Sequence, residues 1–202
     1  NLTASVLYPA EYWPLAEERA WAADWLARHR VADGRPLIVV HPGANWPHKR
    51  WPAERYAELI NRLGADGSAT ILLTGGPDDG PLVLEIAKRL TVPTTTLVGE
   101  GTLRQLAACL ERANLVVTND TGPVHLAAAL RRPTVALFGP TLPSYTGPLG
   151  DPRITRVIHH PDCCPRIPCY HPNHPSHPGM AAISVDEVLA AALVLLKQQH
   201  NP

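Results

Sequence analysis

Apolar residues follow two kinds of spacing along this chain of 202 residues. Short runs such as Leu37–Val40 are rich in β-branched residues and indicate buried strands, whereas longer segments with an apolar residue every three or four positions indicate amphipathic helices. In residues 52–63, for example, Tyr56 and Ile60 lie on one helical face. The pattern predicts strands over residues 37–40, 70–74, 95–98, 115–118, 134–138 and 154–158, and helices over 14–30, 52–63, 82–90, 103–112, 124–130 and 184–198.

The regular alternation of these elements predicts the fold class. Strand–helix units of about 20 to 30 residues are typical of parallel strands joined by helical crossovers. We therefore expect an α/β domain with a Rossmann-like parallel sheet and helices on both faces. Residues 1–30 are predicted to form a leading helix and linker, and residues 31–202 the domain, with a loop rich in proline, histidine and cysteine at 159–179. Ser184 and Glu187 have the spacing of a capping box at the start of the closing helix.

Composition narrows the classes of function. The chain is 45% hydrophobic and 18% charged, enough apolar material for one compact domain. Lys plus Arg equals Asp plus Glu at 18 each, so no overall charge favours nucleic acid, and any anion site must be local. The longest apolar run, residues 188–196, is far shorter than the roughly 20 residues that span a bilayer. Four cysteines do not form a disulfide framework, and we expect a cytoplasmic protein.

The chemistry-bearing residues follow the predicted strands. Thr118–His125 joins a strand directly to a helix, and this arrangement places backbone N–H groups, a hydroxyl and an imidazole around the positive end of the helix. Taken singly, Lys49 is a loop charge, Asp120 a helix cap and His125 a packed histidine. Ligands of open α/β sheets bind outside the carboxyl ends of the strands, however, and polar turns follow five of them, at residues 41–51, 74–79, 99–102, 119–125 and 139–141. Their convergence indicates a nucleotide site with its phosphate end at Asp120–His125.

Together, these turns resemble those in the C-terminal, donor-binding half of a known family, the bacterial lipopolysaccharide heptosyltransferases of glycosyltransferase family 9. The order and spacing agree over about residues 37–141, and the closing helix is similar as well. The matching motifs are His41–Ala44 with Lys49–Pro52, Gly75–Asp78, Thr118–Pro123 with His125, and Leu137–Thr141.

The resemblance implies half of a GT-B fold, in which two Rossmann-like domains face each other and the C-terminal one binds an ADP-activated sugar, typically ADP-heptose, without a metal cofactor. Lys49 and Asp120 are then the candidate catalytic residues: Lys49 contacts donor phosphate or sugar, and Asp120 approaches the sugar. The donor-binding set that the resemblance implies comprises Gly43, Lys49, Gly75, Asp78 on the ribose (with Asp79 as its neighbour and rival), Gly99 beside the adenine, Asp120, and Thr121, Gly122 and His125 on the diphosphate.

Two features depart from the family pattern. Nothing before residue 37 can form the acceptor-binding N-terminal domain, which supplies the catalytic base, so we expect nucleotide binding without sugar transfer by this chain alone. The implied acceptor is the lipopolysaccharide core, reached through that missing domain, which is compatible with peripheral association with the inner membrane. The second departure is Cys163, Cys164 and Cys169 followed by His171, His174 and His177: they offer zinc ligands without a recognised zinc spacing, so a proline-stiffened loop is favoured and no metal ligand is assigned.

Other functions stay open at this point. A UDP-sugar transferase or an epimerase of GT-B type uses a similar pocket, and the base-binding turn after Val98 would decide between them. A noncatalytic nucleotide-binding module is a further alternative. An NAD-dependent enzyme is disfavoured because no Gly-x-Gly-x-x-Gly follows the first strand.

Overall fold

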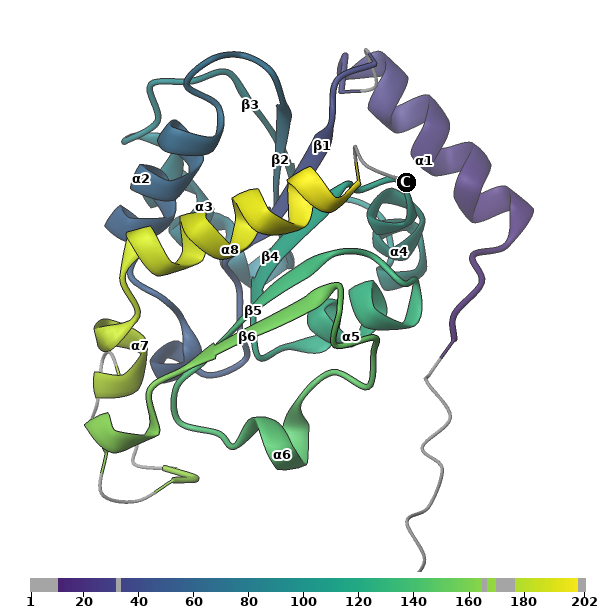
Figure 1. Ribbon diagram of the computed structural model, residues 1–202. Helices are drawn as coiled ribbons and strands as arrows, with labels where there is room; N and C mark the ends of the chain where they lie inside the picture. Colours follow the sequence, from purple (N-terminus) through teal and green to yellow (C-terminus); the bar gives the residue numbers. More distant parts are fainter. Residues whose placement is uncertain (1–10, 32–33, 165–166, 170–176, 200–202) are drawn as a thin grey trace, which may run out of the picture.

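The computed structural model describes residues 11–31, 34–164, 167–169 and 177–199. Its centre is a parallel sheet of six strands in the order β3-β2-β1-β4-β5-β6 (Figure 1). The strands are β1 Leu37–His41, β2 Thr70–Gly75, β3 Thr94–Val98, β4 Leu115–Asn119, β5 Thr134–Phe138 and β6 Thr155–His159. The predicted Rossmann-like sheet is confirmed.

Helices pack on both faces of this sheet. The α-helices are α1 Ala16–Arg28, α2 Ala53–Leu63, α3 Gly80–Ala87, α4 Leu103–Glu111, α5 Gly122–Ala129, α6 Pro143–Thr146, α7 Pro178–Ala182 and α8 Val185–Gln198, and short 3₁₀ turns are η1 Pro47–Lys49, η2 Pro77–Asp79 and η3 Pro161–Cys163. Strand β1 shows how one sequence serves two cores: Ile38 and Val40 pack with α2, α3 and α8, whereas Val39 faces α1 and α4. All five residues of β1 are buried, as expected for a central parallel strand.

The strand order creates a reversal point beside β1. Chain connections proceed from β1 to β2 and β3 on one side, and from β4 to β5 and β6 on the other. The turns after β1 and β4 therefore diverge from adjacent strands, and this crevice is where open α/β sheets bind ligands. The loop beginning at Pro42 and the start of α5 at Gly122 lie at this point.

Predicted and observed elements agree closely, with a few informative differences. The helix predicted over 82–90 begins earlier, at Gly80, and ends at Ala87. The predicted capping box of α8 is present, since the Glu187 N–H donates to Ser184 Oγ at 3.2 Å and the Ser184 N–H donates to Glu187 Oε2 at 2.9 Å. Helices α6 and α7 were not predicted, because segments of 4 and 5 residues are too short to show a helical period.

Helix α1 shares the core of the domain. Its residues Ala22, Trp25 and Leu26 are buried against α4 and the sheet. The Trp25 indole N–H also donates to Glu100 Oε2 at 3.0 Å, which ties α1 to the turn after β3. Among the described residues, no helix combines the length and the apolar character needed to cross a membrane.

Candidate functional site

Two cavities open at the carboxyl edge of the sheet and share Asn45, Thr121 and Gly122 among their lining residues. The larger has a volume of about 620 Å³ and is lined by the turns after β1, β2 and β3 together with the start of α5. The smaller, of about 290 Å³, lies between Trp46, Lys49, Asp120, His125 and Thr146. The shared residues place the start of α5 between the two spaces.

The N-terminus of α5 is built by the polypeptide turning directly out of β4. Strand β4 ends at Asn119, and α5 begins at Gly122, so only Asp120 and Thr121 separate them. Thr121 has an extended backbone and its side chain makes no capping hydrogen bond to the helix. Thr121 and Gly122 border both cavities at the positive end of the helix dipole, an arrangement suited to an anion.

Lys49 and Asp120 form an ion pair in the smaller cavity. Lys49 Nζ lies 2.6 Å from Asp120 Oδ2, and the two side chains are only 16% and 5% exposed. The ammonium group also lies 5.0 Å from the centroid of the Trp46 ring, within the range of a cation–π contact. A positive charge is thus held beside the helix terminus by Asp120, which is 71 residues away along the chain, and by the nearby Trp46 ring.

Two threonines complete the surroundings of Asp120. Thr141 Oγ1 donates to Asp120 Oδ2 at 2.6 Å, and Thr146 Oγ1 lies 3.4 Å from the same oxygen. Sequence reasoning included Thr141 only as part of a motif and gave Thr146 no role. No local signal links these hydroxyls to Asp120, because the contact forms only when the loop after β5 folds back over β4.

Asp78 and Asp79, which the sequence left as rivals, differ in their surroundings. The Asp79 carboxylate is buried, with Oδ1 at 3.2 Å from Arg50 Nη2 and Oδ2 accepting from the Gly76 N–H at 2.9 Å. Asp78 is exposed and lines the larger cavity. Asp79 thus has structural partners, whereas Asp78 faces the space in which a ligand would lie.

Gly43 has a packing role under Asp79. A Cβ atom at this position would lie 2.1 Å from Asp79 Oδ2, so only glycine lets the carboxylate approach the backbone. Gly43 lines neither of the two cavities. The structure therefore places it behind the site, supporting Asp79.

The other predicted residues border the two cavities. Gly75, Asp78 and Gly99 line the larger one, and Gly99 has a positive φ of 66° that favours glycine. Lys49, Asp120 and the exposed His125 line the smaller one, and Thr121 and Gly122 line both. Eight of the nine predicted positions thus line one or both cavities, and Gly43 lies at the same edge of the sheet without lining either.

Asn119 and His41 are two buried residues that the sequence placed in the matching motifs without an individual role. Asn119 Nδ2 donates to the Pro42 carbonyl at 2.7 Å and its Oδ1 accepts from Tyr56 Oη at 2.8 Å, so it joins the turn after β1 to β4. His41 lines the larger cavity, with Nδ1 3.0 Å from Thr74 Oγ1. Burial lowers the pKa of His41 to about 4, against the opposing effect of the Asp79 charge, so the ring is neutral at physiological pH.

Known proteins match this chain through both sequence and structure. A sequence model described as "Glycosyltransferase family 9 (heptosyltransferase)" matches residues 9–172. The lipooligosaccharide heptosyltransferase 2 of Haemophilus influenzae is 41% identical over 122 residues, which are 58% of this chain and 35% of that protein. The lipopolysaccharide heptosyltransferase 2 of Escherichia coli is 40% identical over 134 residues, 63% of this chain and 38% of that protein.

A solved structure extends the similarity to nearly the whole chain. The E. coli ADP-heptose lipopolysaccharide heptosyltransferase II superimposes with a TM-score of 0.77 at 30% identity, over 98% of this chain and 56% of that one. The present chain thus spans between 35% and 56% of the length of these relatives. The family match covers most of the chain, and the chain belongs to glycosyltransferase family 9, the heptosyltransferase family.

Proposed function

We propose that these 202 residues form the donor-binding domain of a GT-B glycosyltransferase that binds an ADP-activated sugar, ADP-heptose, for transfer to the inner core of lipopolysaccharide. Family membership supports the class of reaction, and similarity to the E. coli ADP-heptose lipopolysaccharide heptosyltransferase II supports the donor. The observation that carries the proposal is the Lys49–Asp120 pair beside the N-terminus of α5, in a cavity that shares lining residues with a larger one.

The two cavities suggest how a nucleotide sugar lies. The larger volume, about 620 Å³, falls within the range of small-ligand sites and takes the nucleoside, with Gly99 beside the base and Asp78 within reach of the ribose. The diphosphate crosses Thr121 and Gly122, which line both cavities, and approaches His125. The sugar then occupies the smaller cavity near Lys49 and Asp120.

We propose that the same arrangement stabilises the leaving group and that no metal cofactor is needed. Departure of a nucleoside diphosphate builds negative charge on the β-phosphate. Preorganised dipoles and cations stabilise such charge better than groups that must first reorient. Lys49 is already held at 2.6 Å from Asp120, next to the amides at the start of α5, so the charge it offers is in position before the donor arrives.

Sugar transfer needs an acceptor site and a base in addition to a donor site. In the GT-B arrangement these come from the facing domain, and we propose that the 202 residues alone bind nucleotide but do not transfer sugar. The acceptor, the lipopolysaccharide core, then reaches the reaction through that second domain. The acceptor's lipid would bring the complete enzyme to the inner membrane as a peripheral protein.

Calorimetric titration with ADP tests the phosphate site. Lys49→Ala and His125→Ala are each expected to weaken ADP binding by about 1 to 3 kcal/mol, the range for losing a charge-assisted hydrogen bond. Lys88→Ala is a matched control, because Lys88 is exposed at the end of α3 and lines neither cavity.

Two results would contradict the proposal at different levels. Unchanged ADP affinity in both site variants would remove the phosphate site. Tighter binding of UDP than of ADP would leave the site intact and exclude the ADP-sugar assignment, in favour of another GT-B nucleotide-sugar enzyme. Thermal shifts with the two nucleotides at equal concentration provide this second comparison.

A further inference from the structure

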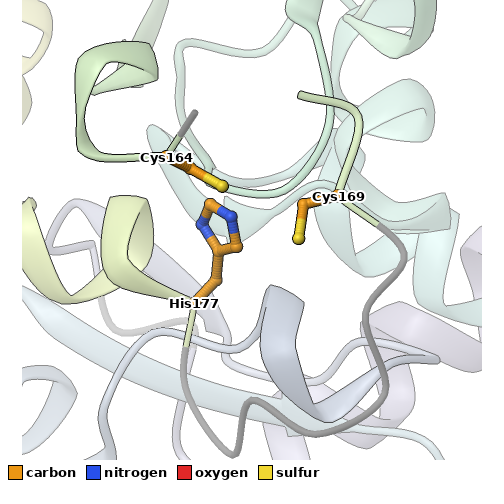
Figure 2. A group of neighbouring side chains, drawn as sticks. All are labelled: Cys164, Cys169 and His177. Atoms are coloured by element: carbon orange, nitrogen blue, oxygen red, sulfur yellow. The ribbon is translucent and has the colours of Figure 1, made fainter. Parts of the chain in front are cut away.

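Cys164, Cys169 and His177 come together on the side of the domain near α7 (Figure 2). Their ligand atoms all lie within 4.8 Å of one another, and the three side chains point toward a common centre. They arise from separate points of the chain: Cys164 follows η3, and His177 is the residue before α7. His177 is fully buried, and the two cysteines are partly buried.

We propose that these three residues bind a divalent transition metal, with Zn²⁺ the best match. Two thiolates and one imidazole form a borderline-soft donor set, the kind that selects zinc over magnesium or calcium. A Zn–S bond of about 2.3 Å puts two tetrahedral ligands roughly 3.5 to 4 Å apart, so small side-chain rotations bring the three atoms to a common ion. Three protein ligands leave one position of the tetrahedron for water or a further side chain.

The backbone around each ligand is held in place. The Cys169 N–H donates to the Pro140 carbonyl at 2.7 Å, and the Cys164 N–H donates to the Pro161 carbonyl at 3.2 Å. The Gly179 N–H donates to His177 Nδ1 at 3.1 Å, and this hydrogen bond has to open when His177 binds a metal, because a neutral imidazole offers a single ring lone pair. The three side chains are thus close together without a metal, and the main rearrangement on binding is the exchange of this hydrogen bond for a metal–nitrogen bond.

The position of this cysteine–histidine cluster indicates what the metal would do. Gly139 packs so closely on α7 that a Cβ atom there would lie 2.4 Å from Met180 Cγ. Pro140 accepts from Cys169, and the next residue, Thr141, donates to Asp120. A metal at the cluster would fasten Cys164, Cys169 and the start of α7 onto the loop after β5. We assign it a structural role, and this inference does not depend on the proposed function.

Metal analysis of the chain provides the test. The chain is expressed without a polyhistidine tag, purified under reducing conditions and examined by elemental mass spectrometry, with about one Zn²⁺ per chain expected. Cys164→Ser and Cys169→Ser are each expected to lose at least about nine-tenths of the metal. Cys163→Ser is a closely matched control, because Cys163 is the adjacent residue, is exposed and lies outside the cluster.

Two measurements on the unmodified chain keep the proposal testable if a variant fails to fold. A chelator is expected to lower the melting temperature of the chain, and added Co²⁺ to give the charge-transfer absorption of a thiolate complex. Absence of both stoichiometric metal and the Co²⁺ absorption would overturn the proposal, as would a Cys164–Cys169 disulfide found by peptide mass spectrometry in its place. Equal metal loss in Cys163→Ser would overturn the assignment of ligands.

Discussion

The His41 side chain is enclosed at the end of β1, next to Thr74 and the larger cavity. An imidazolium ion there would lose its hydration and gain only the partial compensation of the Asp79 charge, so burial lowers the pKa of His41 to about 4. In the unfolded chain the same ring titrates near its ordinary value of about 6.5. Between these two values the unfolded state binds more protons than the folded state.

Stability is therefore expected to fall as the pH is lowered from about 6.5 toward 4, the pKa of folded His41. The free energy of unfolding is unaffected by His41 protonation above the pKa of the unfolded chain. At pH 4 the protonation of His41 lowers it by up to about 3 kcal/mol. Denaturant unfolding at several pH values checks this in the chain and in His41→Asn, in which the dependence should flatten. Part of the slope will persist, because burial also lowers the pKa of His159.

A matched histidine variant separates this effect from general loss of histidine. His125→Gln changes an exposed ring and should leave the dependence of stability on pH as it is in the unmodified chain. A His41→Asn chain with the same slope as the unmodified one would show that His41 is not the titrating group.

The location of a site residue was predictable where the residue follows a strand directly. Its contacts were not predictable where the partner is distant in the sequence. Lys49 and Asp120 both stand in polar turns after strands, so their place at one edge followed from the alternation of elements. Their direct ion pair did not, and neither did the hydroxyl of Thr141 on Asp120. For Gly43 the motif did not show the contact that the structure adds: the absence of a side chain lets the Asp79 carboxylate approach the backbone.

At the scale of the elements, α8 depends on a start signal that is visible in the sequence. Ser184 Oγ accepts from the Glu187 N–H, and the Glu187 carboxylate accepts from the Ser184 N–H, which satisfies two donors at the helix end. This fixes the first turn, from which Val185 and Val188 are buried in the core shared with α2 and the sheet. The cap thus sets where the helix packs as well as where it begins.

Ser184→Ala is expected to lower the free energy of unfolding by about 1 kcal/mol, the usual value for an N-cap. Chemical denaturation measures the change, and Ser144→Ala serves as the control because Ser144 is exposed in the four-residue α6. A loss no larger than that of the control would mean that the capping box contributes nothing measurable to stability.

Helices of more than two turns and strands with five buried residues were thus predictable from their hydrophobic period and their caps. Helices α6 and α7 were not, because they are short and are held by tertiary contacts rather than by a period of their own. In α7 the packing of Met180 against Gly139 sets the position of the helix. The cysteine–histidine cluster lies beside α7, where spacing in sequence gave no guide to distance in space.

At the scale of the whole molecule, α1 connects the domain's outer layer to its ligand edge. Trp25 is 2% exposed, packs within the core shared with α4, and bonds Glu100 in the turn that lines the larger cavity. This packing predicts that the helix unfolds together with the domain, and the hydrogen bond to Glu100 ties it to the turn that lines the cavity.

Trp25→Ala is expected to destabilise the domain by about 3 to 5 kcal/mol, as large aromatic truncations in packed cores do. Trp13→Ala is the control, since Trp13 is 71% exposed just before the same helix. Equilibrium unfolding followed by circular dichroism compares them. Equal and small effects of the two substitutions would show α1 to be an appendage that the sheet does not need.

The ion pairs at the carboxyl edge of the sheet affect how strongly a charged ligand is attracted to this edge from solution. Lys49 faces Asp120 and Arg50 faces Asp79, and the chain as a whole carries no net charge. Close opposite pairs cancel one another beyond a few ångströms, so little field reaches into solution. If the proposed function holds, an anionic nucleotide arrives by unsteered diffusion, and discrimination takes place after contact, when its phosphate oxygens compete with Asp120 for the Lys49 ammonium group.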